Sequence, residues 1–324
     1  MSDPAAPQSG PSGLPRAGRR TEDVAGHWVL ARLGKRVLRP GGRRLSHQLL
    51  LDVDPEARDV VEFAPGIGRT AAEIVALAPL SYIGVEEDPD AAALTEAVVG
   101  EAGRVVRADA AATGLPDASV DVVIGEAMLT MQGAAGKAAI LGEARRILRR
   151  EGRYAIHELA LEPDALDEAD KTTIRRALAR SIKVNARPLT GEEWRTLLEE
   201  NGFAIESVRY APMALLQPRR LVADEGLGRA LRFVVNVLRD ADGRRRVLDM
   251  RATFRRYRRN LAAIAIVAVR KERVTSWTSK DVQETSRILV PDRAAGTAGG
   301  WWRGSVRRTP ATLTAQPASR RSGC

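Results

Sequence analysis

The feature that most constrains the fold of this 324-residue chain is an apolar segment that runs directly into a glycine-rich turn. Residues 60–70 read Val-Val-Glu-Phe-Ala-Pro-Gly-Ile-Gly-Arg-Thr, and apolar positions continue over 71–77 at helical spacing. Gly66 and Gly68 allow the backbone to bend sharply, and neither carries a Cβ that would keep a ligand at a distance. The helix that follows presents unpaired N–H groups at its start. This strand, turn and helix predict a ligand-binding edge of an open α/β sheet.

Short apolar segments alternate with helical patterns along this part of the chain. We expect five strands here, over residues 59–64, 81–85, 104–107, 120–125 and 153–158. Asp88 and Pro89 predict a helix start, and Gly152 predicts the end of the helix whose apolar stripe covers 140–148. Strands that alternate with helices predict an α/β fold with a doubly wound, mostly parallel sheet and right-handed crossovers.

The second half of the chain predicts two further strands, over 203–208 and 262–269. One helical insert, about 161–186, follows the fifth strand. The other, 213–261, lies between the sixth and seventh strands and contains two helical patterns. Both inserts leave the C-terminal half of the sheet, so we expect them to wall a substrate pocket together.

These elements predict one domain, 21–271, between two tails. The ligand-binding core of the domain is expected over 57–160. Residues 1–20 and 272–324 are rich in small and polar residues and lack sustained periodicity, so we expect them to be mostly disordered.

Positive charge is concentrated at the ends of the chain and in one helical segment. The formal net charge is +10, with 7 basic and 3 acidic residues in 1–40 and 10 and 4 in 271–324. The stretch 41–270 holds 34 of each and is neutral, but within it 219–259 holds 13 arginines against 5 acidic residues. This segment predicts a solvated helical face, and a surface for an anionic substrate or for nucleic acid is the alternative.

The composition excludes several classes of protein and site. Cys324 is the only cysteine and there are three histidines, which excludes a disulfide framework and a cysteine-based metal site. The longest apolar run, 261–269, has nine residues, against the roughly 20 that a membrane span requires. The first residues lack the apolar stretch of a secretory signal. We therefore expect a cytoplasmic protein without a membrane span or a metal ion.

Three acidic residues lie where the predicted strands reach the ligand-binding edge: Glu62 in the first strand, Glu86 ending the second and Asp109 after the third. The spacing of Gly66 and Gly68 also fits a dinucleotide-binding turn. Such a turn has no need of a carboxylate within its strand, whereas a ligand with an ammonium group can use Glu62. Glu86 can accept both hydroxyls of a ribose, which suits either ligand. The position of Glu62 therefore argues against an NAD-dependent oxidoreductase.

This ordered set resembles the class I S-adenosylmethionine-dependent methyltransferases, and more narrowly their small-molecule "type 11" group. The likeness covers residues 57–160 and extends more weakly to 271, and it includes an Arg-x-Leu-x-x-x-Gly helix end at 146–152. It departs at Ala64 and Pro65, where a Gly-Cys or Gly-Ser pair is commoner. The resemblance implies a seven-stranded sheet with a reversed last strand and S-adenosyl-L-methionine as the cofactor.

The resemblance also implies which residues bind that cofactor. The implied contacts are Glu62, Ala64, Gly66 and Gly68 for its methionine and ribose part, Glu86 for the ribose, and Asp109 with Ala110 for the adenine.

Methyl transfer is an in-line attack on a sulfonium, so much of the catalysis can come from holding the two reactants in place. A base is needed only when the nucleophile must lose a proton. The candidates are Glu126, after the fourth strand, and His157, at the end of the fifth. His157 is the better base because its intrinsic pKa lies near neutrality, and a hydrogen-bonded structural histidine is the alternative.

The segment 27–42 predicts a short amphipathic helix and a turn, which either cap the cofactor or pack on the sheet edge.

We therefore expect an S-adenosylmethionine-dependent methyltransferase (EC 2.1.1.-) with a small-molecule acceptor. The alternatives are an RNA or protein methyltransferase that uses the arginine-rich 219–259 face, and a non-catalytic module that only binds the cofactor. The fourth strand does not end in Asn/Asp-Pro-Pro-aromatic, which argues against the amino-methylating DNA enzymes that use this motif. The acceptor, the atom methylated and the oligomeric state stay open.

Overall fold

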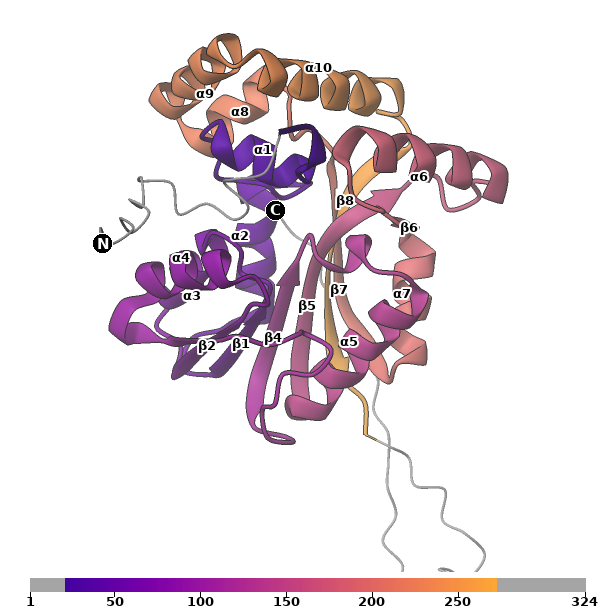
Figure 1. Ribbon diagram of the computed structural model, residues 1–324. Coiled ribbons are helices and arrows are strands. Elements are labelled where there is room, and N and C mark those ends of the chain that lie inside the picture. The colour runs from indigo at the N-terminus through magenta and orange to yellow at the C-terminus, as the bar shows by residue number, and fades with distance from the viewer. Residues whose placement is uncertain (1–20, 273–324) are drawn as a thin grey trace, which may run out of the picture. The chain divides into compact units, whose positions relative to one another are not determined.

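The computed structural model describes residues 21–272, in which a central sheet separates two layers of helices (Figure 1). The strands are β1 Asp59–Phe63, β2 Ser81–Val85, β3 Arg104–Val106, β4 Val120–Glu126, β5 Leu148–Leu161, β6 Leu189–Thr190, β7 Phe203–Pro212 and β8 Leu261–Arg270. The α-helices are α1 Gly26–Arg32, α2 Gly42–Val53, α3 Arg69–Val75, α4 Pro89–Val99, α5 Ala134–Ile147, α6 Glu168–Ile182, α7 Gly191–Glu200, α8 Pro218–Glu225, α9 Leu227–Arg239 and α10 Ala241–Arg256. Single 3-10 turns cover Thr21–Asp23, Gly100–Ala102 and Leu129–Met131. The two expected tails lie outside the described residues, apart from Glu272.

The sheet has the strand order β3-β2-β1-β4-β5-β8-β7, with β6 paired to the end of β5. Strands β1 to β5 run parallel, and β8 is antiparallel to both of its neighbours. The α/β class, the mostly parallel sheet and the reversed last strand are therefore confirmed. Within the described residues the sheet has eight strands rather than seven, because β5 is long enough for Ala160 and Leu161 to pair with β6.

Side chains of the strands alternate between two apolar layers, as the two-residue period of a strand requires. Val61 and Phe63 of β1 enter the layer beneath α5 and α7, whereas Val60 enters the layer beneath α2, α3 and α4. On the second face β8 presents small side chains, including Ala263 and Ala265, and α2 lies against β5 and β8 there. This contact fixes α2 close to the carboxyl end of β4.

A third helical region lies at the carboxyl ends of the parallel strands. Helices α1, α8, α9 and α10 share one buried cluster, and α6 contributes to a second one beside it. Figure 1 shows α8, α9 and α10 together beyond α1. The second insert contains three helices rather than the expected two, because Gly226 separates α8 from α9 and Asp240 caps α10 by accepting the Gly243 N–H at 2.8 Å. None of the helices in the described part of the chain has the length and apolar character needed to cross a membrane.

One predicted helix boundary also differs from the structure. Helix α5 ends at Ile147, well before Gly152, because Leu148 already pairs with Val120 as the first residue of β5. The register then shifts before Arg153 pairs with Val122. The predicted stop glycine therefore lies in an irregular stretch of β5.

Candidate active site

A cavity of about 710 Å³ lies at the carboxyl ends of β1, β2 and β4. Its volume falls within the range of about 300–1,000 Å³ that is usual for ligand sites. The predicted site residues that line it are Glu62, Ala64, Gly66, Glu86, Asp109, Ala110 and Glu126. Gly68 and His157 are not among its lining residues. The topology thus brings seven of the nine predicted residues to one cavity.

The turn after β1 adopts left-handed backbone conformations at Ala64, Gly66 and Gly68, with φ of 53°, 65° and 71°. A Cβ built on Gly66 would have its nearest neighbour, the Ala64 carbonyl oxygen, 4.0 Å away. The same atom on Gly68 would lie 3.1 Å from the Val98 side chain and 3.2 Å from the Thr95 Cα. The space beside Gly66 is therefore open to a ligand, whereas Gly68 allows α3 and α4 to pack closely.

Glu62 and Glu86 are both buried beside this turn. Glu62 accepts a hydrogen bond from the Tyr82 hydroxyl at 2.7 Å. Burial raises the pKa of Glu62 to about 8, and the Tyr82 hydrogen bond opposes that rise only in part. Glu86 accepts the Gly66 N–H at 3.0 Å on one oxygen and the Asp88 N–H at 3.1 Å on the other. Glu86 therefore ties the end of β2 to the glycine turn and keeps lone pairs for a ligand.

Asp109 lies at the other end of the cavity, in the loop after β3. One carboxylate oxygen accepts the Ala111 N–H at 2.8 Å, which holds the loop in a local turn. The side chain is otherwise exposed, and it lines the cavity beside Ala110.

Glu126, at the end of β4, is the centre of a buried polar cluster. It forms an ion pair with Arg39 at 3.0 Å, approaches His157 Nδ1 at 2.8 Å, and accepts the hydroxyls of Ser46 and Thr70. Burial by itself would raise the pKa of Glu126. The positive charge of Arg39 and the hydrogen bonds from His157 and Ser46 outweigh it and lower the pKa to about 2. Glu126 is therefore ionised at every physiological pH.

His157 lies behind Glu126, with its side chain fully buried. Its Nε2 lies 3.0 Å from the Gly41 N–H. A backbone N–H only donates, so Nε2 must accept, and the ring proton then sits on Nδ1, facing Glu126. Both ring nitrogens therefore have partners within the protein.

Arg39 is a site residue that the sequence analysis missed. Its side chain is only 7% exposed and lines the cavity, and its Nη2 has no hydrogen-bond partner among the described residues. Its Nη1 lies 4.0 Å from the Glu73 carboxylate, beyond hydrogen-bonding distance. A buried guanidinium with an unused donor is a binding group for an anion. Nothing in the local sequence marks Arg39, because its partners lie on β4 and α3.

A smaller cavity of about 100 Å³ adjoins the first and shares lining residues with it. The shared residues are His27, Leu38, Ala127, Met131 and Val184. The other walls are mostly apolar and come from both helical inserts, including Leu178 and Ile182 of α6 and Phe254 of α10. The buried Glu158 holds the loop after β4 by accepting three backbone N–H groups and the Thr130 hydroxyl.

The segment before α2 covers both cavities. His27 and Leu38 line both cavities, and Trp28 lines the larger one. Helix α1 itself packs on α10 and α6. The segment therefore lines the cavity and packs on helices of the two inserts rather than on the sheet edge.

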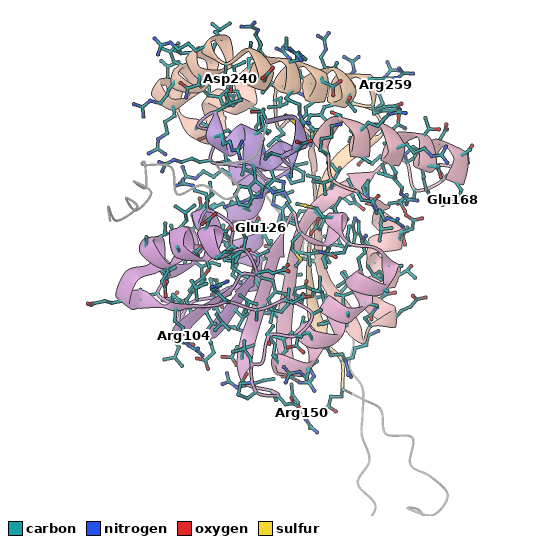
Figure 2. All side chains as sticks on the ribbon, in the orientation of Figure 1. Arg104, Glu126, Arg150, Glu168, Asp240 and Arg259 are labelled. Atoms are coloured by element: carbon teal, nitrogen blue, oxygen red, sulfur yellow. The ribbon has the colours of Figure 1, made fainter. Side chains whose placement is uncertain are left out.

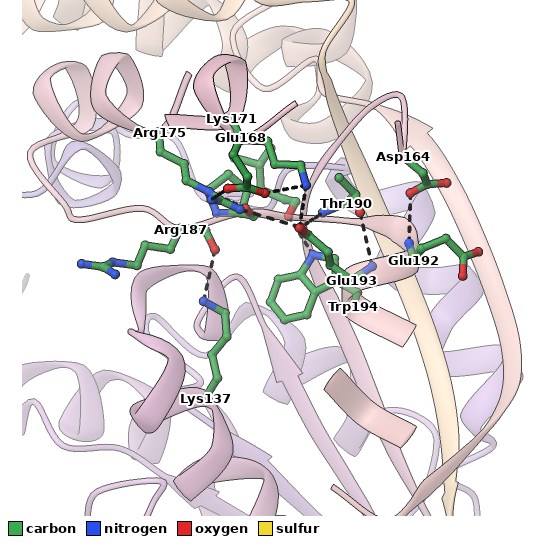
Figure 3. A network of polar contacts seen from close by, with 12 residues as sticks. Lys137, Asp164, Glu168, Lys171, Arg175, Arg187, Thr190, Glu192, Glu193 and Trp194 are labelled. Atoms are coloured by element: carbon green, nitrogen blue, oxygen red, sulfur yellow. Dashed lines mark hydrogen bonds and ion pairs between the residues drawn. The ribbon is translucent and has the colours of Figure 1, made fainter. Parts of the chain in front are cut away.

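A second large hollow, of about 780 Å³, lies beside α6 and α7 (Figure 3). Several of its charged side chains are paired with one another. Lys171 pairs with Glu168 at 2.9 Å and with Glu193 at 2.7 Å, and Lys137 donates to two backbone carbonyls. Glu193 also closes a capping box with Thr190 at the start of α7. This network stabilises the junction of the two helices, and none of the predicted site residues lies in it.

A family model described as a methyltransferase domain (Methyltransf_11) matches residues 61–156. An uncharacterized protein of Haemophilus influenzae is 32% identical over 251 residues, which cover 76% of this chain and 98% of that protein. Among solved structures, phosphoethanolamine N-methyltransferase 2 of Haemonchus contortus in complex with S-adenosyl-L-methionine has a TM-score of 0.58 at 15% identity and covers 79% of this chain and 59% of its own.

Two further solved structures have the same fold. The cyclopropane synthase MmaA2 of Mycobacterium tuberculosis has a TM-score of 0.58 at 14% identity, over 78% of this chain and 99% of its own. The [4+2]-cyclase SpnF has a TM-score of 0.55 at 13% identity, over 70% of this chain and 80% of its own. At these identities the likeness shows the fold, and the residues of this chain must indicate the chemistry.

Proposed function

Because the chain belongs to the class I S-adenosylmethionine-dependent methyltransferases, we propose that it transfers the cofactor's methyl group to a small molecule with an apolar body. The observation that carries this proposal is the junction of the two cavities. The larger one contains the glycine turn and its carboxylates, and the smaller one is apolar and shares five lining residues with it. An acceptor in the apolar cavity would face a group bound at the end of β4.

The residues of the larger cavity fit the cofactor. The open backbone at Gly66 leaves room for it, Glu86 would accept its ribose hydroxyls, and Asp109 with Ala110 would contact its adenine. Glu62 would face its ammonium group, and the unused nitrogen of Arg39 would bind its carboxylate. When bound, the cofactor supplies an electrophilic methyl group on a sulfonium.

We infer that transfer proceeds mainly by positioning, without a strong general base. Both nitrogens of His157 are engaged within the protein. Glu126, with a pKa of about 2, is a weak base. Arg39, Glu126 and His157 instead hold the segment before α2 to β4 and β5 beside the methyl site. This arrangement suits an acceptor whose nucleophilic atom attacks without first losing a proton to the protein, or is already ionised at neutral pH.

The raised pKa of Glu62 predicts that cofactor binding releases a proton. At pH 7 a carboxyl group with a pKa of about 8 is mostly protonated. An ammonium group beside it favours the ionised form, so affinity should rise as the pH approaches 8. Titration calorimetry at pH 7 in two buffers of different ionisation enthalpy should give different heats, and Glu62→Gln should abolish the difference. Equal heats in both buffers for the unmodified protein would contradict this placement.

The apolar cavity predicts a variant that separates acceptor binding from cofactor binding. Leu215 is half-buried and lines only the smaller cavity, so Leu215→Trp should fill it. We expect the KM for an acceptor, found by screening lipid-like and phenolic compounds for methylation, to rise at least tenfold with an unchanged cofactor Kd. Leu216→Trp, at the half-buried neighbour outside the lining, is the matched control. Equal effects of the two variants would place the acceptor elsewhere.

A further inference from the structure

We propose that α9 and the arginines around it form a docking site for the surface of an anionic lipid bilayer. One face of α9 carries four exposed apolar side chains: Leu227 at 75%, Leu231 at 63%, Val234 at 43% and Leu238 at 62% exposure. We call these four residues the α9 stripe. The site is distinct from both cavities, and the proposal goes beyond the proposed methyl transfer.

The α9 stripe follows from the geometry of the helix. Its positions are spaced by four, three and four residues, which places them on one face. A neighbouring face carries Ala230 and Phe233, which are buried against the rest of the protein. The apolar arc of α9 is therefore wider than the part that the described residues cover. Single exposed leucines are common on protein surfaces, but a continuous apolar stripe marks an interaction site.

Positive charge surrounds the α9 stripe. The segment 219–259, which contains most of α8 and all of α9 and α10, has 13 arginines and 5 acidic residues, a net charge of +8. Because 41–270 is neutral as a whole, the remainder of that stretch carries −8. Arg229, Arg232 and Arg239 are exposed on α9 itself. Figure 2 shows many nitrogen-tipped side chains projecting from the helical region in which Asp240 and Arg259 are labelled.

Charge and apolarity together select the partner. A second copy of the chain would bring one strongly positive surface against another. The chain's own ends, 1–40 and 271–324, are also basic, with net charges of +4 and +6. A nucleic acid would match the arginines but not the leucines, and the segment has few aromatic side chains on which bases could stack. An anionic bilayer matches both features. Its negative headgroups can bind the arginines, and its apolar interior can bury the exposed apolar face of a helix that lies in the plane of the membrane surface.

Docking would also place the apolar cavity close to the bilayer. Met250 and Phe254 of α10 line that cavity, and α10 packs directly on α9. Helix α9 would therefore contact lipid, and α10, which packs on it, walls the cavity. The docking test below measures binding alone, so its outcome does not depend on the acceptor or on methyl transfer.

The test is co-sedimentation of the full chain with vesicles of phosphatidylglycerol and phosphatidylcholine, and with vesicles of phosphatidylcholine alone. Leu231→Gln with Leu238→Gln removes half of the α9 stripe without changing charge. Leu51→Gln with Leu80→Gln makes the same change at two exposed leucines outside 219–259 and is the matched control. A third variant, Arg232→Gln with Arg239→Gln, tests the charged rim. Thermal melting of each variant checks that it is folded.

We expect the unmodified chain and the matched control to bind the anionic vesicles, and the stripe variant to bind at least tenfold more weakly. The rim variant should also bind more weakly and with a smaller salt dependence. Equal binding by the stripe variant and the control would overturn the proposal. The proposal would also be overturned if the stripe variant lost self-association but kept vesicle binding. Tight binding of an RNA oligonucleotide by both the unmodified chain and the stripe variant would overturn it as well.

Discussion

Glu126→Gln is expected to lower the free energy of unfolding by about 3 kcal/mol. Removing one partner of a buried ion pair leaves the other charge without compensation, which typically costs about 3–5 kcal/mol. Arg39 would be that charge, with Glu73 as its next carboxylate at 4.0 Å. Chemical denaturation at pH 7 measures the loss.

The control for this variant is Asp117→Asn, which makes the same chemical change at a carboxylate that is 79% exposed and pairs with Arg146. An exposed pair contributes about 0–1 kcal/mol, so this variant should be nearly as stable as the unmodified chain. A Glu126→Gln loss no larger than that of the control would mean that Glu126 is not the centre of a buried charge cluster.

The same cluster predicts how stability depends on pH. The folded-state pKa of Glu126 is lowered to about 2 from an ordinary value of 4.5. Its contribution is therefore complete above pH 4.5 and is lost as the pH falls towards 2. The stability of Glu126→Gln should accordingly fall less steeply than that of the unmodified chain across this range.

Glu86→Ala is expected to weaken S-adenosylmethionine binding about ten- to a hundredfold. In the proposed binding mode the variant removes a charged hydrogen bond to the ribose, worth about 1.5–3 kcal/mol. It also removes the acceptor of the Gly66 N–H, which should loosen the glycine turn and weaken cofactor binding further. Calorimetric titration gives the Kd of both proteins.

The matched variant for Glu86 is Glu87→Ala, at the adjacent exposed carboxylate on the cavity wall. We expect its Kd to stay within about threefold of the original, because an exposed charge is screened by water and salt. If Glu86→Ala bound the cofactor as tightly as Glu87→Ala, the ribose would have to lie elsewhere.

Local patterns predicted seven of the eight strands, because each of those seven contains its own short apolar run. The apolar residues that mark β2 at 81–85 and β4 at 120–125 lie within a few positions of one another, so no distant residue is needed to recognise them. The start of α4 is likewise marked locally, by Asp88 and Pro89. The family resemblance supplied the reversed last strand, which periodicity could not. Gly226 could have indicated the break between α8 and α9, but a single glycine within a helical pattern does not fix a boundary.

The polar cluster could not be predicted in the same way. Helix α2 has an apolar stripe at 45, 49, 50 and 53 that the sequence analysis overlooked, and α2 carries Ser46 to Glu126 from 80 positions away. His157 was singled out for its intrinsic pKa, but its environment depends on Gly41, 116 positions earlier. Arg39 belongs to the site only because the chain folds back over the cavity. Such pairings are products of tertiary packing rather than of local pattern.

The central claim is that the cavity at the glycine turn binds S-adenosylmethionine. Its most direct test is calorimetric titration of the purified chain with S-adenosylmethionine, with its demethylated product S-adenosylhomocysteine and with NADH. We predict saturable one-to-one binding of the two sulfur compounds and none of NADH, with Glu86→Ala weakening both. Binding of NADH, or no binding of either sulfur compound by the folded protein, would contradict the account.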